Sequence, residues 1–231
     1  MTRTIVQRDA SACDQLPDDL HPVLRRVYAA RTIESADDLD YSLQRLLPPS
    51  LLGGMTAAVD LLQQAIVGRQ RIVVVGDFDA DGATSCALSL RALRAMGAVD
   101  VHYLVPNRFE YGYGLTAEIV AVAAELLPDL IMTVDNGISS IDGVAAARQR
   151  GIRVLITDHH LQGEQLPAAD AIVNPNLRGD PFPSKNLAGV GVAFYVMLAL
   201  RARLREQGWF EQAGLPEPTS LCGLTWLHWG R

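Results

Sequence analysis

The sequence has little cysteine, no long apolar run and no excess of positive charge. Three of its 231 residues are cysteines, and none forms a CxxC pair, which argues against a disulfide framework and favours reduced, buried thiols. The longest apolar stretch, about Val190 to Leu200, is too short to cross a bilayer. The first ten residues contain no apolar run of the kind that marks a signal peptide. We therefore expect a cytoplasmic protein without a membrane partner.

The charge balance bears on the kind of partner. Twenty Lys and Arg residues stand against 26 Asp and Glu residues, a formal net charge of −6, whereas a surface that binds nucleic acid is usually basic. Acids clustered around a metal lower the net charge locally, so the balance does not decide against a nucleic-acid partner. Nothing in the sequence indicates a protein partner.

Hydrophobic periodicity divides the chain. Residues 1–70 predict a small helical region, because LHPVLRRVYAAR and GGMTAAVDLLQQAIVGR carry apolar residues at helical spacing. From Arg71 onward, short β-rich runs alternate with helical stretches, which predicts an α/β fold, an open parallel sheet with helices on both faces. The runs are RIVVVG, VDVHYLVP, DLIMTV, RVLIT and DAIVNP. We expect this domain to cover residues 71–207 and a tail to cover residues 208–231.

Polar residues gather where the predicted strands end. In an open α/β sheet, ligands bind beyond the carboxyl ends of the strands. Five carboxylates and two adjacent imidazoles follow the first, third and fourth strands, and an Asn-Pro-Asn segment follows the fifth. These side chains are Asp77, Asp79, Asp81, Asp135, Asp158, His159, His160, Asn174 and Asn176. Like charges this close repel unless cations neutralise them, and oxygen ligands with one or two imidazoles suit Mn²⁺ or Mg²⁺.

Each of these residues also has a plainer interpretation. An Asp at a strand-to-helix turn is often a helix N-cap, and capping alone would explain Asp135 equally well. The acids at alternate positions, Asp77, Asp79 and Asp81, need more than capping, and a histidine pair directly after Asp158 is seldom structural. Two ions that share a bridging carboxylate form the clamp used in phosphoryl hydrolysis. In sheet order, the residues predict such a metal site.

Three segments, VVVGDFDADGATS, TVDNGISS and ITDHHL, resemble the motifs of the DHH phosphoesterases. The flanking segments VPNRFEYGYGL and AIVNPNLRGDPFPSKNLAGVGVAFYVMLAL are similar to those of RecJ-type exonucleases within that superfamily. The resemblance implies a hydrolase with Mn²⁺ or Mg²⁺, a 5′→3′ exonuclease for single-stranded DNA in repair and recombination. One alternative is a relative that cleaves a cyclic dinucleotide, an oligonucleotide or pyrophosphate. Another is a non-enzymatic module with a regulatory Mg²⁺.

The resemblance implies a role for each residue of the motifs. Asp79 and Asp81 would each bind one ion, and Asp135 would bridge the two. His159 would bind the second ion, and His160 would face the scissile phosphate.

Two further acids complete the implied site. Asp158 would orient the two histidines without binding a metal ion itself. Many DHH phosphodiesterases carry a metal-binding histidine four residues before the first ligand, where this sequence has Val75. Asp77 would cover that vacancy.

A segment after the second predicted strand, residues 107–114, would contact the DNA. Arg108 is expected to bind a phosphate, and Tyr111 and Tyr113 to stack on bases. The alternative is a tight loop whose aromatic rings pack inward.

Groups after the fifth predicted strand would hold the DNA backbone. Arg178 and Lys185 would meet phosphates. Gly189 and Gly191 open a helix whose amides would favour an anion. Otherwise these glycines only allow close packing of the helix start.

The end of the sequence departs from the resemblance. RecJ-like chains continue past EPTSL with text such as DLVALGTVADVVPL, whose Asp completes the second metal shell, whereas this sequence continues CGLTWLHWGR. Codons for DLVALGT, read one base later, give TWLHWGR, which is Thr225 to Arg231. We therefore expect a frameshifted tail, an incomplete domain without its fourth motif, and an inactive fragment.

We predict that metal stabilises the fold, because a cation relieves repulsion within the acidic cluster and binds the folded state alone. Thermal melting is measured in Mn²⁺, in Zn²⁺ and in a chelator, and the midpoint is expected to be highest in Mn²⁺. Equal midpoints in all three solutions would contradict the metal site.

Overall fold

The computed structural model describes residues 6, 8, 10, 16–40 and 42–219, so the tail residues 220–231, with Thr225 to Arg231, lie outside the described residues. The chain divides into two compact units, Met1–Pro48 and Pro49–Arg231. The first unit contains α1 (Pro22–Ala29) and the 3-10 helices η2 (Ala36–Leu39) and η3 (Leu43–Arg45). Proline suits the start of α1, because the first helical position needs no N–H donor.

The second unit is built on a five-stranded parallel sheet with the strand order β2-β1-β3-β4-β5. The strands are β1 (Ile72–Gly76), β2 (Val101–Leu104), β3 (Leu130–Val134), β4 (Arg153–Thr157) and β5 (Ala171–Val173). Every residue of β1 and β3 is buried, as expected for parallel strands covered on both faces. The chain leaves β1 toward one side of the sheet and β3 toward the other, so the topological switch point lies between β1 and β3.

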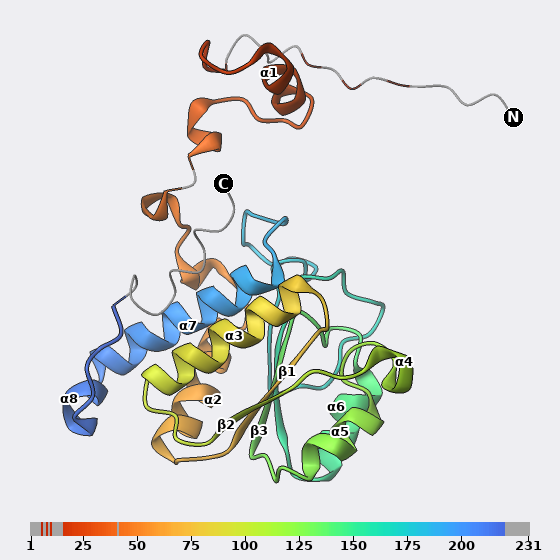
Figure 1. Cartoon of the computed structure of the whole chain (residues 1–231), viewed down its shortest axis with the longest axis vertical. Helices are drawn as coiled ribbons and strands as arrows, with labels where there is room; N and C mark the ends of the chain where they lie inside the picture. Colours follow the sequence, from red (N-terminus) through yellow and green to blue (C-terminus); the bar gives the residue numbers. More distant parts are fainter. Residues whose placement is uncertain (1–5, 7, 9, 11–15, 41, 220–231) are drawn as a thin grey trace, which may run out of the picture. The chain divides into compact units, whose positions relative to one another are not determined.

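Helices cover both faces of this sheet (Figure 1). On one face lie α2 (Met55–Val67), α3 (Ala80–Ala95) and α7 (Gly189–Glu206), with α3 and α2 both packed on α7. On the other face lie α5 (Ala117–Ala124) and α6 (Ile141–Gln149), packed on each other. The remaining elements of this unit are η4 (Pro49–Leu51), α4 (Arg108–Tyr111) and α8 (Trp209–Ala213). The expected α/β fold with an open parallel sheet is confirmed.

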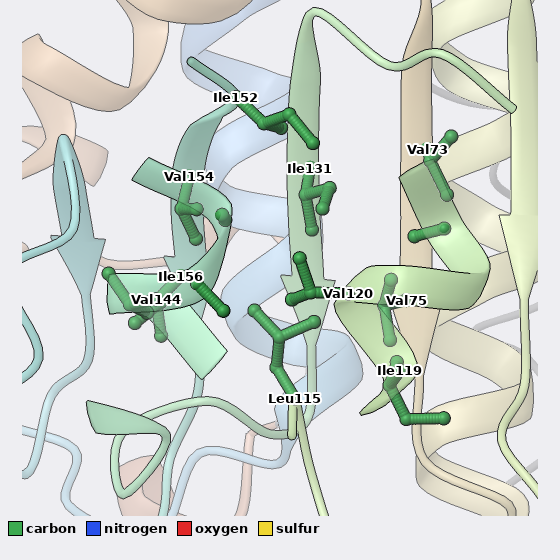
Figure 2. Packing of buried hydrophobic residues seen from close by; sticks show 13 residues of the cluster. Val73, Val75, Leu115, Ile119, Val120, Ile131, Val144, Ile152, Val154 and Ile156 are labelled. Atoms are coloured by element: carbon green, nitrogen blue, oxygen red, sulfur yellow. The ribbon is translucent and has the colours of Figure 1, made fainter. Parts of the chain in front are cut away.

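Alternate side chains of each strand enter different cores. Figure 2 shows the core under α5 and α6, where apolar residues of three strands meet those of both helices and of the segment before α5. Its labelled members are Val73, Val75, Leu115, Ile119, Val120, Ile131, Val144, Ile152, Val154 and Ile156. Because the side chain of Val75 points into this core, it lies on the far side of β1 from α3.

The helix α2 belongs to the sheet-containing unit, whose boundary lies between Pro48 and Pro49, whereas the helical N-terminal region was expected to run to residue 70. Its buried stripe, which includes Leu62 and Ile66, packs on α7 and β5. Asp60 of α2 also forms a 2.7 Å ion pair with Arg203 of α7. Helical periodicity predicted the helix, but it does not say which surface the apolar stripe covers.

The described part of the expected tail, residues 208–219, begins with the helix α8. In α8, Phe210 is buried, and the Trp209 indole donates a 2.9 Å hydrogen bond to the carbonyl of Met96.

Of the three cysteines, Cys86 is described, and it is a free, buried thiol whose pKa is raised to about 11, first by burial and then by Asp135. Within the described segments, no helix combines the length and apolarity that a membrane span requires.

We predict that Ile131→Ala destabilises the protein by about 2–5 kcal/mol, because it leaves a cavity in the fully buried centre of β3. Urea unfolding gives the free energy. Val99→Ala, at a side chain that is 56% exposed, is the control and should change stability by less than about 0.5 kcal/mol. Equal losses for the two variants would contradict this packing.

Candidate metal centre

The register of the sheet brings the polar strand ends together. Gly76 pairs with Val134, Val134 with Thr157, and Thr157 with Val173, so these strands end at one level. The next residues along the chain therefore leave the sheet side by side. They are Asp77, Asp135, Asp158 and Asn174. Since this edge includes the switch point between β1 and β3, it is the expected ligand edge of the sheet.

Asp135 lies at the centre of this edge. Its φ of 61° is in the left-handed region, which Asp tolerates better than most residues, and its side chain is only 2% exposed. Its Oδ1 is 3.1 Å from His159 Nε2 but accepts no well-formed hydrogen bond within the described part of the chain. Burial, followed by the carboxylates of Asp81 and Asp79, raises the pKa of Asp135 to about 7. A cation beside Oδ1 would give the buried oxygen a partner and would offset the repulsion from Asp81 and Asp79.

Two groups of side chains could hold such cations. One is Asp135 with His159 and His160, and the other is Asp77 and Asp79 with Asp135. Within each group the ligand atoms all lie within 4.8 Å of one another. Because both groups contain Asp135, that carboxylate has the position of a bridge. The donors are oxygen and imidazole nitrogen, a set that fits Mn²⁺ or Mg²⁺.

Asp79 and Asp81 both take part in helix starts. Asp79 is the N-cap of α3 and accepts a 2.9 Å hydrogen bond from the Gly82 amide. Asp81 reaches across to α7, where its carboxylate accepts hydrogen bonds of 2.8 Å from the Gly189 amide and 2.7 Å from the Val190 amide. Its Oδ2 is 3.8 Å from His159 Nε2. Asp81 is therefore next to the two ligand groups, but it belongs to neither.

The start of α7 is closed to a substrate anion by these contacts, so the expectation that Gly189 binds phosphate is not supported. A Cβ on Gly189 would lie 2.4 Å from Asp135 Oδ1, and one on Gly191 would lie 2.5 Å from a methyl carbon of Leu187. Both glycines therefore allow close packing, which is the alternative left open by the sequence.

Asp158 organises the histidine pair. It is buried, and its Oδ1 accepts hydrogen bonds from His160 Nδ1 at 2.7 Å and from the His159 and His160 amides at 2.7 and 3.1 Å. Its Oδ2 accepts from the Ile138 amide at 2.9 Å. Burial raises the pKa of Asp158, but the hydrogen bonds from His160 and Ile138 outweigh burial and lower it. The same hydrogen bond raises the pKa of His160.

Three asparagines form hydrogen bonds at the strand ends. The sequence placed Asn174 and Asn176 at this edge but did not show which groups they contact. Buried Asn136 donates from Nδ2 to the carbonyls of Val75 and Val134, at 3.1 and 2.9 Å, and so joins β1 to β3. Asn174 and Asn176 donate from Nδ2 to the carbonyls of the two histidines. The available signal was their position within three residues of a strand end.

The aromatic residues expected to contact DNA take different positions. Tyr113, 44% exposed, places its hydroxyl 3.5 Å from both ring nitrogens of His160, and burial with nearby carboxylates raises its pKa, so it stays protonated. Tyr111 is partly buried and packs against the core under α5 and α6, which is the inward packing left open by the sequence. Phe109 is 94% exposed. Arg108 begins α4, but its side chain lies outside the described residues.

The two basic residues after β5 also differ from each other. Lys185 donates from Nζ to the carbonyls of Pro175 and Asp180, at 2.6 and 2.8 Å, so its ammonium braces the loop. The Arg178 side chain is exposed. Arg178 therefore remains the better candidate for a phosphate contact.

A cleft of about 900 Å³ lies beside His160. Its walls include Tyr113, Thr116 before α5, and Ser139 and Ser140 before α6. Among the described residues, its lining contains carboxylates and hydroxyls but neither Lys nor Arg. A bound phosphate would therefore have to lie at the metal-ligand end.

This chain therefore combines a parallel sheet with carboxylates and imidazoles at its switch point. The family model described as "DHH family, N-terminal domain" matches residues 71–218, and the chain belongs to this family.

Within this family, the chain is clearly similar to proteins named RecJ. The chain is 60% identical over 215 residues to the single-stranded-DNA-specific exonuclease RecJ of Dickeya dadantii, covering 93% of this chain and 37% of that protein. It is 55% identical over 212 residues to RecJ of Escherichia coli K12, covering 92% and 37%. A crystal structure of RecJ with Mn²⁺ from Thermus thermophilus has 36% identity and a TM-score of 0.63, covering 87% and 26%. The chain thus spans little more than a third of the D. dadantii and E. coli proteins and about a quarter of the T. thermophilus chain.

We predict that Asp81→Ala, in chelator, lowers the free energy of unfolding by about 1 kcal/mol, because α7 loses the carboxylate at its first amides. Urea unfolding measures the loss, and Asp81→Asn, which keeps one acceptor oxygen, should lose less. Glu164→Ala, on an exposed loop, is the control. If Asp81→Ala matches Glu164→Ala, the carboxylate does not stabilise α7.

Proposed function

We propose that the chain carries the metal-dependent hydrolytic centre of a 5′→3′ exonuclease that removes nucleotides from single-stranded DNA in repair and recombination. The observation that carries the proposal is the buried carboxylate of Asp135, shared by two ligand groups directly beside His160. The names of the RecJ relatives support the substrate and the reaction. Because those relatives are bacterial and act on DNA, the proposed location is the cytoplasm.

Asp77, Asp79, Asp135 and His159 would hold Mn²⁺ or Mg²⁺, which when bound would activate water and neutralise the attacked phosphate. Asp81, 3.8 Å from His159 Nε2, would add a ligand oxygen while it remains on α7. The T. thermophilus structure named for its Mn²⁺ supports this choice of ion.

His160 and Tyr113 would act on the substrate. Asp158 accepts a hydrogen bond from Nδ1 of His160 and raises the pKa of the imidazole. In its protonated form the ring would donate from Nε2 to a phosphate oxygen. The hydroxyl of Tyr113 lies beside the same imidazole and would donate there too. Both groups sit where the cleft meets the ligand cluster.

The single strand would pass over an exposed surface next to this point. Phe109 and Tyr113 expose ring surface on which unpaired bases stack. Arg108 and Arg178 are the proposed phosphate contacts. A duplex would present no unstacked base to these rings, which fits a preference for single strands.

We predict that Asp135→Ala abolishes Mn²⁺ binding and cleavage, whereas His160→Ala keeps Mn²⁺ binding and slows cleavage by about 10²–10⁴-fold. Titration calorimetry on this chain measures binding. Cleavage of end-labelled single-stranded DNA, with duplex as control, is measured on this chain and on a chimaera in which it replaces the matching part of E. coli RecJ. Loss of Mn²⁺ from His160→Ala but not from Asp135→Ala would reverse the assignments. Cleavage of a cyclic dinucleotide instead of DNA would replace the substrate.

A further inference from the structure

The histidine pair lies in a loop without regular structure, yet both sides of its backbone are tied. The amide N–H groups of His159 and His160 donate to Asp158 Oδ1. On the other side, the His160 carbonyl accepts a 2.9 Å hydrogen bond from Asn174 Nδ2, and the His159 carbonyl accepts one from Asn176 Nδ2. Asp158 therefore binds the amide groups of the histidine loop, and the two carboxamides bind its carbonyl groups.

These carboxamides are themselves fixed in place. Asn174 follows β5 directly and is fully buried, and its Oδ1 accepts a 2.7 Å hydrogen bond from the Asn176 amide. This hydrogen bond closes a turn between the Asn174 side chain and the backbone two residues later, so it fixes the position of Asn176 relative to Asn174. Lys185 Nζ holds the intervening carbonyl of Pro175 at 2.6 Å. The segment is thus a rigid brace whose side-chain donors point at the histidine loop.

The brace determines where the two imidazoles lie. Their ring centroids are 4.6 Å apart, with His159 Nε2 at 3.1 Å from Asp135 and His160 Nδ1 at 2.7 Å from Asp158. A change in the peptide planes of the loop would swing both rings away from these partners. A metal ligand displaced in this way binds its ion more weakly.

We propose that Asn174 and Asn176 are positioning residues, which set the histidine pair for metal and substrate from outside the three motifs. The inference rests on the proposed function for its purpose, but the geometry exists without metal. Neither asparagine touches a reacting atom in the proposed reaction.

The test uses Asn174→Asp and Asn176→Asp, each of which replaces the donor NH₂ by oxygen and leaves the size of the side chain unchanged. Asn186→Asp, at an exposed position in the same loop, is the matched control. Mn²⁺ affinity is measured from the electron paramagnetic resonance signal of the free ion. An added negative charge by itself would tighten cation binding, so a loss of affinity reports displaced ligands.

We expect Asn174→Asp and Asn176→Asp to lower Mn²⁺ affinity by about 10–100-fold, with Asn186→Asp within about twofold of the parent. Affinity that is unchanged or increased in folded variants would overturn the proposal, even if their melting temperatures fall. Should buried Asn174→Asp fail to fold, Asn176→Ala decides by the same measurement.

A readout without metal separates this inference from the proposed function. In chelator, the Nδ1 proton of His160 should give a protected, low-field NMR signal in the parent and in Asn186→Asp. It should be lost in Asn176→Ala, and its survival there would overturn the positioning role. A parent that shows the signal but binds no Mn²⁺ would refute the metal site and leave the brace standing.

Discussion

Hydrogen bonding between parallel strands fixes which residues leave a sheet together, and the site depends on that constraint. Because Gly76, Val134, Thr157 and Val173 form one row, the residues after them emerge as one cluster. A shift of one strand by one residue would turn its side chains to the opposite face. The buried cores on both faces therefore hold the register, and the register holds the carboxylates at contact distance.

Close packing around Asp135 shows how far the fold accommodates a charged group. Its backbone is left-handed, and its Oδ1 is buried without a well-formed hydrogen bond. The backbone of Gly189 packs so closely on this carboxylate that a Cβ at position 189 would clash with it. Each feature costs stability by itself. Next to Asp135 in the chain, Asn136 joins β1 to β3 through hydrogen bonds to Val75 and Val134. A cation bound beside Oδ1 would offset the cost of the buried, unpaired oxygen.

Sequence patterns predicted the parallel sheet and the cluster at its edge, because strand–helix alternation and motif spacing are local signals. They could not predict which distant parts of the chain each side chain contacts. The period of α2 gave its apolar stripe but not the α7 surface that it covers, and Tyr111 carries no mark that distinguishes packing inward from stacking outward. The contact of Asp81 with the start of α7 could not be predicted either, because its hydrogen bonds go to amides 108 and 109 residues further along the chain. The role of the asparagines likewise depends on backbone carbonyls, which no sequence pattern displays.

The bond between Asp81 and α7 has a consequence during synthesis of the chain. A nascent polypeptide leaves the ribosome from its N-terminus, so the acids after β1 emerge about a hundred residues before the amides that bind one of them. Contacts of such long range form slowly, because loop-closure entropy must be overcome first. Until α7 has been translated and has docked, the acidic loop is exposed to solvent with one carboxylate uncapped. The polar edge of the sheet is thus assembled late, and a ribosome stalled before residue 189 would carry a sheet whose acidic side chains are present but not yet arranged.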